Sequence, residues 1–387
     1  MKTALTAAAL ITPTKRLENA VLVMEDSRIE AVGTRDQIAI TQSMKHVDFG
    51  DSVLAPGFID MHIHGAAGHD VMEGTSDALT AVETLLAAHG VTSYCPTTVT
   101  APMDKTLAAL EQLGRSIGDA SKHAGKVRAR PVGIHLEGPF ISTAKCGVHP
   151  IADITAPTLV LFDQLWNASQ GSVRVMTIAP ELSGAEEVIR EASKRGVCVS
   201  LGHSNALAAE TQKAIAAGAA HVTHTFNAMR PLDHREPGIL GVALSDSGLT
   251  ADIIADGVHV APEILRLFLA CKKDDGAVLI SDGISATGMG DGKFKLGTIE
   301  VEVRGMECRA NGKLAGSVLT LDRAVRNVMQ ISQWKLERVV RLATLNPARI
   351  LGITDRKGSL APGKDADIVV LTPHGEIVKT IIGGVGA

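Results

Sequence analysis

The sequence is poor in aromatic side chains, lacks clustered basic residues and has no long apolar run. Only 3% of its 387 residues are Phe, Trp or Tyr, so few rings are present on which bases or long glycans could stack. The net charge is -4 and lysine and arginine form no cluster, which argues against nucleic acid as a partner. No stretch reaches the roughly 18 uninterrupted apolar residues of a membrane helix. We therefore expect neither a nucleic-acid partner nor a membrane span.

Cysteine is also scarce, and its five positions show no C-x-x-C spacing. An odd number of cysteines without a framework suits a reducing compartment better than a disulfide-stabilised fold. The opening run M-K-T-A-L-T-A-A-A-L-I resembles a short signal peptide, but threonines interrupt it and strand-like sequence follows through Met24. We therefore expect a cytoplasmic protein.

The two ends of the chain share a texture of short strands and turns. Neither residues 1–55 nor residues 356–387 contain enough apolar positions to fold alone. We predict that they pair into one small β-sandwich domain, with residues 56–355 inserted between them. The expected strands are Thr3–Ile11, Ala20–Met24, Arg28–Val32, Lys45–Phe49, Ala366–Leu371 and Ile377–Ile382.

The middle of the chain alternates strand-like and helix-like patterns. Helical periodicity covers Asp77–His89, Met103–Ile117, Ala185–Arg195, Ala206–Ala217 and Pro262–Lys272. About eight predicted strands end near His64, Pro96, Glu137, Thr177, His203, His224, Ala255 and Asp282. Several are almost wholly apolar, as strands covered on both faces of a parallel sheet are. The pattern predicts a (β/α)8 TIM-like barrel with its active site at the C-terminal strand ends. A doubly wound open sheet is the alternative, but the phosphate-binding G-x-G-x-x-G that it requires is absent.

The segment Leu54–Gly65, L-A-P-G-F-I-D-M-H-I-H-G, combines a turn signal with an alternating strand. Side chains on a strand alternate between faces, so His62 and His64 project the same way. By itself an H-x-H pair is as readily explained by chance as by metal binding. Its meaning depends on the residues that end the later strands.

Four other predicted strands also end in a candidate ligand or base. These residues are Glu137, His203, His224 and Asp282. Each alone could be a structural residue, a hydrogen-bonded core histidine or a helix cap. At one barrel mouth, however, buried charges without a cation would be costly. Imidazole and carboxylate ligands suit zinc, with iron, manganese or cobalt as alternatives. With Asp282 as general base and then general acid, this set predicts metal-assisted hydrolysis of an amide.

Two longer motifs give this pattern a family. They are P-G-F-I-D-M-H-I-H-G and the closing K-G-S-L-A-P-G-K-D-A-D-I-V-V-L. Both resemble motifs of the amidohydrolase superfamily. Six shorter motifs occur between them in the order H-L-E-G-P-F, G-H-S, H-T-F-N-A-M, R-E-P-G, D-G-V-H and L-A-G-S. They resemble the N-acetylglucosamine-6-phosphate deacetylase family of that superfamily. Dihydroorotase-like relatives typically carry a carboxylated lysine that bridges two metals, and no lysine occupies such a strand end here. Glu137 occupies that third strand instead.

The resemblance implies a role for each matching residue. Glu137, His203 and His224 would hold the main metal, and His62 and His64 would allow a second ion, so one or two ions per subunit are expected. Asp282 would be a metal-site acid/base, and His149 in K-C-G-V-H-P would polarise the acetyl carbonyl. A phosphorylated amino sugar would contact Val148, Asn227, Ala228, Arg235, His259, Leu314, Ala315 and Gly316. Arg235 would reach in from the partner of a homodimer, where its guanidinium matches phosphate oxygens.

The expected reaction is hydrolysis of N-acetylglucosamine 6-phosphate to glucosamine 6-phosphate and acetate, within amino sugar metabolism. A first alternative is deacetylation of another N-acyl amine, such as N-acetylgalactosamine 6-phosphate or an N-acyl amino acid. A second is an assembly protein on the same fold that lost its chemistry. Such a protein should lack ligands or the strand-eight aspartate, and all are present.

Overall fold

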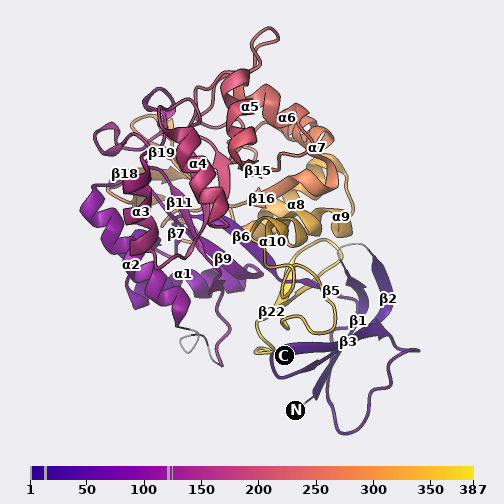
Figure 1. The fold of residues 1–387 in the computed structure, drawn as a ribbon. Helices are drawn as coiled ribbons and strands as arrows, with labels where there is room; N and C mark the ends of the chain where they lie inside the picture. Colours follow the sequence, from indigo (N-terminus) through magenta and orange to yellow (C-terminus); the bar gives the residue numbers. More distant parts are fainter. Residues whose placement is uncertain (1, 13–14, 120–122, 124) are drawn as a thin grey trace.

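The computed structural model describes residues 2–12, 15–119, 123 and 125–387. Figure 1 shows two regions: strands of the chain's two ends lie together beside both termini, and the middle of the chain forms a larger body of strands and surrounding helices. None of the helices in the described ranges has the length and apolar character that crossing a membrane requires.

The strands from the two ends form one mixed sheet of seven strands. Its order is β22-β21-β5-β1-β2-β3, and β4 also pairs with β1. The bounds are β1 Lys2–Ile11, β2 Arg16–Glu25, β3 Arg28–Thr34, β4 Lys45–Asp48, β5 Val53–Pro56, β21 Ile368–Leu371 and β22 Ile377–Ile381. The expected β-sandwich is not confirmed, because these strands are hydrogen bonded into a single sheet. The opening run that resembles a signal peptide lies in β1, apart from Met1, which is outside the described residues.

A curled parallel sheet forms the centre of the larger body. Its order is β10-β9-β11-β12-β13-β14, and β6 pairs with β9. The bounds are β6 Phe58–Ile63, β9 Val91–Thr98, β10 Arg130–Pro131, β11 Ile134–Glu137, β12 Val173–Ile178, β13 Cys198–Leu201 and β14 Ala219–Val222. β15 (Ala251–Ile254) and β16 (Ala277–Ile280) make a separate parallel pair. The alternation of strands and helices that the sequence predicts is confirmed, in a half-barrel whose ladder is interrupted on both sides of this pair.

Helices follow most of these strands and lie around the sheet (Figure 1). They are α1 Ser76–Ala88, α2 Met103–Gly118, α3 Leu159–Ala168, α4 Ala185–Lys194, α5 Ala208–Ala217, α6 Gly238–Ser245, α7 Pro262–Gly276, α8 Leu321–Ser332, α9 Leu336–Val340 and α10 Leu345–Ile350. Side-chain caps explain two of the starts, since Thr75 accepts from the backbone of Ala78 and Thr158 from that of Leu161. Short 3-10 turns are η1 Val71–Glu73, η3 Thr143–Lys145, η4 Ile151–Asp153 and η5 Arg341–Ala343.

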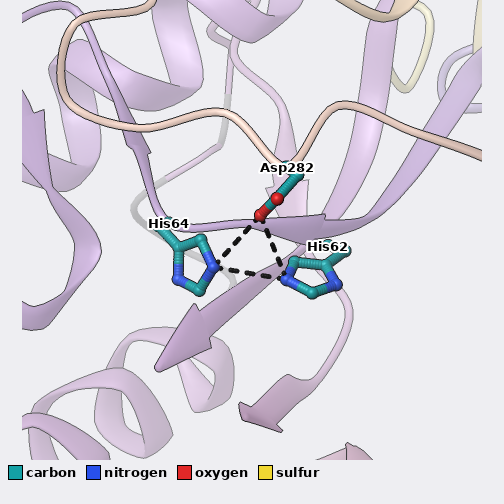
Figure 2. A group of neighbouring side chains, drawn as sticks. All are labelled: His62, His64 and Asp282. Carbon is teal, nitrogen blue, oxygen red and sulfur yellow. Dashed lines mark hydrogen bonds and ion pairs between the residues drawn. The ribbon is translucent and has the colours of Figure 1, made fainter. Parts of the chain in front are cut away.

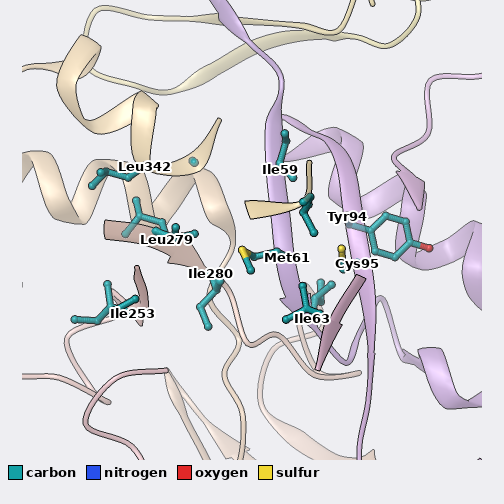
Figure 3. Close-up of a cluster of buried hydrophobic side chains, with 14 of the residues drawn as sticks. Ile59, Met61, Ile63, Tyr94, Cys95, Ile253, Leu279, Ile280 and Leu342 are labelled. Carbon is teal, nitrogen blue, oxygen red and sulfur yellow. The ribbon is translucent and has the colours of Figure 1, made fainter. Parts of the chain in front are cut away.

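The main core lies where the odd-numbered residues of β6 meet β16. Ile59, Met61 and Ile63 are buried in one cluster with Leu279 and Ile280 (Figure 3). The other parity of β6 carries Asp60 and His62, and this division agrees with the alternation of the sequence. One strand of the sheet is thus apolar on one side and carries ionisable groups on the other.

A four-stranded antiparallel sheet between β16 and α8 does not follow from the βα pattern of the sequence. It consists of β17 Gly292–Leu296, β18 Ile299–Arg304, β19 Glu307–Ala310 and β20 Lys313–Leu314. Leu296, Val301 and Val303 of this sheet are buried in a small hydrophobic cluster, the small core, which is separate from the main core. A further two-stranded ribbon, β7 Gly65–Ala66 with β8 His69–Asp70, follows β6 directly.

Candidate metal and active site

His62 on β6 and His64 directly after it converge, as their shared parity predicts. The Nε2 atoms of His62 and His64 are 3.2 Å apart, and each lies 3.3 Å from Oδ1 of Asp282. Figure 2 shows both rings, from β6 and the residue after it, turned toward the Asp282 carboxylate from the segment after β16. All three residues are buried and form a group that could hold a metal ion.

Glu137, the last residue of β11, places one carboxylate oxygen toward each of two groups of histidines. Its Oε1 atom lies 3.0 Å from Nε2 of His224 and 3.3 Å from Nε2 of His203. Its Oε2 atom lies 3.2 Å from Nε2 of His64 and 3.5 Å from Nε2 of His62. The carboxylate therefore lies between the two groups, where it could bridge two ions.

The donor set fits a divalent metal. Two ligand atoms held 2.0–2.1 Å from one ion in tetrahedral geometry are about 3.4 Å apart. The Nε2 atoms of His203 and His224 are 3.1 Å apart, close to that value, and both contact the same oxygen of Glu137. The Nδ1–H groups of His64 and His203 donate to the carbonyl oxygens of Thr97 and Lys145, at 3.0 Å each. Burial lowers the pKa of His203, so its ring is neutral and its Nε2 lone pair points toward Oε1 of Glu137, 3.3 Å away, which is unfavourable without a cation between them.

His203, His224 and Asp282 lie in turns after their strands, and the backbone conformation of these turns directs their side chains inward. β13 and β14 end two residues before His203 and His224, and β16 ends two residues before Asp282. The prediction that the strands end at these residues was therefore wrong by two positions. Their φ angles are +47°, +28° and +51°, in a region that side chains with a Cβ rarely adopt. Such strain persists where the surroundings fix it, and it concentrates at functional sites.

Charges within the cluster stabilise its carboxylates as anions. Burial raises the pKa of Asp282, but His62 and His64 outweigh it and lower the pKa to about 2. Burial also raises the pKa of Glu137, but the surrounding imidazoles outweigh burial and hold this pKa well below its usual range. Burial lowers the pKa of His203 to about 4. In contrast, carboxylate hydrogen bonds outweigh burial and raise the pKa of His64 to about 10. The cluster thus presents two carboxylate anions, as a cation site requires.

His149 lies against this cluster with one ring nitrogen already used. The backbone N–H of Thr100 donates to its Nδ1 at 3.3 Å, and the Thr100 hydroxyl lies 2.9 Å from the same atom. Because Nδ1 accepts, a neutral ring carries its proton on Nε2. Nε2 lies 3.6 Å from Oε2 of Glu137. The ring can therefore donate a hydrogen bond to an oxygen placed over the cluster.

A cavity of about 170 Å³ opens over the cluster. The predicted residues that line it are His64, Glu137, Val148, His149, His203, His224, Asn227, Ala228, His259, Asp282, Leu314 and Gly316. Three others do not line it: His62 lies beneath, in contact with Glu137 and Asp282; Ala315 is buried in the small core; and Arg235 is exposed on the loop before α6. Most of the predicted set is therefore brought together from separate elements.

The cavity has two further lining residues that the sequence did not indicate. Gly147 comes from the loop that carries His149, and Leu296 ends β17. Gly147 lies next to predicted residues, whereas Leu296 belongs to the unforeseen sheet and is one apolar residue among many. His135 shares the parity of Glu137 but is not part of the cluster, because its ring contacts the Met61 carbonyl and the Thr177 hydroxyl.

Comparison with known proteins places the chain in a family. The sequence profile of the Amidohydrolase family matches residues 53–386, and the chain belongs to this family. It is 39% identical over 349 residues to N-acetylglucosamine-6-phosphate deacetylase of Bos taurus, which covers 87% of this chain and 84% of the relative. It is 40% identical over 320 residues to N-acetylgalactosamine-6-phosphate deacetylase of Escherichia coli O157:H7, covering 82% and 83%.

A solved structure resembles the whole chain. It is a mutant of N-acetyl-D-glucosamine-6-phosphate deacetylase from Mycobacterium smegmatis, in complex with N-acetyl-D-glucosamine-6-phosphate. The two chains share 35% identity with a TM-score of 0.91, over 99% of this chain and 98% of the other. The resemblance thus includes the terminal sheet as well as the parallel one.

Proposed function

We propose that the protein is a metal-dependent hydrolase that converts N-acetyl-D-glucosamine 6-phosphate into D-glucosamine 6-phosphate and acetate. The observation that carries the proposal is the position of Glu137, with nitrogens of two proposed ligand histidines near each of its oxygens. His149 lies 3.6 Å from its Oε2, and Asp282 contacts the two histidines on that side. The names of relatives at 39% and 35% identity support the choice of substrate.

Each group around the cavity has a task in this reaction. Glu137, His203 and His224 would hold one ion, with zinc as the first expectation, and His62 and His64 with Glu137 a second. Such an ion lowers the pKa of water and polarises an acyl oxygen. His149 donates its Nε2–H to that oxygen and orients the amide. Asp282 takes the proton of the attacking water and delivers it to the departing amine.

The sugar phosphate would occupy the outer part of the cavity. Asn227, Ala228 and His259 would bind it on one side, and Val148, Leu314 and Gly316 on the other. Ala315, which is buried in the small core, would support the two residues beside it. Nδ1 of His259 lies 2.7 Å from a carboxylate oxygen of Asp256, which fixes the ring and supports a binding role. We also propose a homodimer in which Arg235 of the partner reaches the phosphate. The exposure of Arg235 away from the cavity of its own chain supports this arrangement.

The finer description of the fold is part of the same proposal. We infer a (β/α)8 barrel spanning residues 56–355, supported by backbone hydrogen bonds across both interruptions, from Thr225 to Asp252 and from Asp282 to His62. Residues 1–55 and 356–387 would form the second domain, supported by the pairing of β5 with β21. A cytoplasmic location is supported by five cysteines that are all free.

A second candidate substrate is N-acetylgalactosamine 6-phosphate, which differs at one hydroxyl. The 40% identity to a deacetylase named for that sugar favours it. The test compares acetate release from both phosphorylated sugars and from unphosphorylated N-acetylglucosamine, before and after metal chelation. We expect the highest kcat/KM for N-acetylglucosamine 6-phosphate and loss of activity on chelation. Equal rates with the unphosphorylated sugar would contradict the phosphate role, and full activity after complete metal removal would contradict the mechanism.

A further inference from the structure

The parallel strands lack a continuous backbone ladder at two boundaries in the described part of the chain, between β14 and β15 and between β16 and β6. A fully buried aspartate lies at each boundary, Asp252 on β15 and Asp60 on β6. Asp60 belongs to the P-G-F-I-D-M-H-I-H-G motif, but both aspartates lie inside their strands rather than at the ends, so the strand-end rule does not select them. Both nevertheless contact the segments that carry the proposed metal ligands.

Asp252 fixes the turn that contains His224. One oxygen of its carboxylate accepts the backbone N–H of His224, and the other lies 2.9 Å from Nε2 of His221. Its main-chain oxygen accepts from both the N–H and the hydroxyl of Thr225, at 3.0 and 2.8 Å. A side-chain carboxylate thus supplies the acceptor that the missing ladder does not, at a residue whose φ of +28° needs an external restraint.

Asp60 makes the equivalent contacts at the other boundary. Its Oδ1 atom accepts the backbone N–H groups of His62 and Ser281, at 3.3 Å each. Ser281 directly precedes Asp282. One carboxylate oxygen therefore ties the backbone of a proposed ligand on β6 to the segment that carries the proposed acid/base.

The four ligand histidines are held in two different ways. The Nδ1 atoms of His64 and His203 contact backbone carbonyl oxygens, which fixes both rings. The Nδ1 atoms of His62 and His224 have no hydrogen-bond partner among the described residues. These two are the histidines whose backbone N–H groups bind Asp60 and Asp252. His62 and His224 are thus fixed through their backbone N–H groups, whereas His64 and His203 are fixed through their rings.

We propose that Asp252 and Asp60 are positioning residues, which hold His224 and His62 in the geometry that binds a divalent ion. The inference rests on the metal-dependent function proposed above. Residues that hold metal ligands in place typically change metal affinity or activity by about 10–100-fold when they are removed. The expected consequence is weaker metal binding in a protein that remains folded.

The test uses Asp252→Ala and Asp252→Asn, with Asp322→Ala as the matched control. Asp322 is also a buried carboxylate next to a histidine, 3.0 Å from Nδ1 of His89, but it lies on α8 and outside the cavity. Zinc affinity is measured by competition with a chromophoric chelator. Tm is measured in the metal-stripped and the zinc-loaded protein, because a ligand that binds only the folded state raises Tm according to its affinity.

For Asp252→Ala we expect zinc affinity to fall about 10–100-fold and the rise in Tm on zinc loading to shrink. Asp252→Asn retains an oxygen that accepts from His224 but loses the one beside His221, so a smaller loss, about 3–10-fold, is expected. Asp322→Ala should lower both Tm values and leave zinc affinity and the rise in Tm unchanged. Asp60→Ala should mainly weaken the binding of the second zinc ion, because His62 is a proposed ligand of that ion on the Oε2 side of Glu137.

Wild-type zinc affinity in a folded Asp252→Ala variant overturns the role of Asp252, and unchanged binding of both equivalents in Asp60→Ala overturns that of Asp60. If Asp252→Ala does not fold, wild-type affinity in Asp252→Asn overturns the role of Asp252 instead. These outcomes are separate from failure of the proposed function. Zinc-loaded wild-type protein that releases no acetate from the phosphorylated sugar contradicts the substrate, whereas normal zinc affinity in the variants contradicts only the positioning.

Discussion

The two sides of the Glu137 carboxylate are built differently. On the Oε2 side, His62 and His64 are two residues apart in sequence, and one strand turns both inward. On the Oε1 side, His203 and His224 come from two different strands and lie in left-handed turns after them. The first group depends on local strand geometry, and the second depends on the packing of neighbouring βα units. We therefore expect the second group to respond more strongly to changes at distant residues.

The largest effect is expected from removing the charge that the two sides share. Glu137→Gln retains the shape of the side chain but leaves a neutral group among five imidazoles. We expect kcat/KM to fall by at least about 1,000-fold and bound metal to fall with it, because charge stabilisation by the ion is lost. Steady-state kinetics together with elemental analysis provide the measurement. Near-normal metal content and rate would show that the carboxylate does not bridge the two sides.

The next effect separates acid/base chemistry from metal binding. Asp282→Asn should lower kcat by about 100- to 10,000-fold through loss of proton transfer. KM should change little, because Asp282 does not contact the sugar phosphate in the proposed arrangement. The comparison is with Glu137→Gln, which should lose metal from both groups, whereas Asp282→Asn should keep the ion held by Glu137, His203 and His224. A kcat that is unchanged in Asp282→Asn would assign the proton transfer to another residue.

A smaller, substrate-selective effect is expected at the outer part of the cavity. Arg235→Ala removes a charge-assisted hydrogen bond to phosphate, worth about 1.5–3 kcal/mol, or roughly 10- to 150-fold in kcat/KM. The loss should be confined to phosphorylated sugars, and assays with unphosphorylated N-acetylglucosamine serve as the control. An equal loss on both sugars would favour a different role for this loop.

The smallest effect concerns stability at a distance from both sides. Burial raises the pKa of Asp322, but hydrogen bonds from His89, Thr320 and Arg326 outweigh it and leave the pKa well below its usual range. Because the folded-state pKa is depressed, the stabilisation is present above the unfolded pKa of about 3.9 and is lost as pH falls toward the folded value. Asp322→Asn should lower Tm by a few degrees at pH 7. Thermal melts should show this difference narrowing below about pH 4, and a constant difference would contradict the charge effect.

The predictability of the site follows the same division. The H-x-H pair could be recognised in the sequence because strand alternation alone orients both rings. The bounds of α1, α2 and α4 were predicted from apolar periodicity, and the observed bounds agree with them within one residue. The turns at His203 and His224 were not visible, because their backbone partners are distant in sequence: Ser142 donates to the carbonyl of His203, and Asp252 accepts the N–H of His224. The sheet β17–β20 was missed because its short alternating strands interrupt the βα pattern. The contribution of Leu296 to the cavity was missed with it.

The central claim is that Glu137 and imidazole nitrogens from separate strands hold a divalent cation together. Anomalous diffraction at the absorption edge of the metal, from crystals of the active zinc-loaded protein, tests it most directly. The account predicts a peak about 2.0–2.2 Å from Oε1 of Glu137 and from Nε2 of His203 and His224. An active crystal whose metal lies elsewhere, with these three atoms uncoordinated, would contradict it.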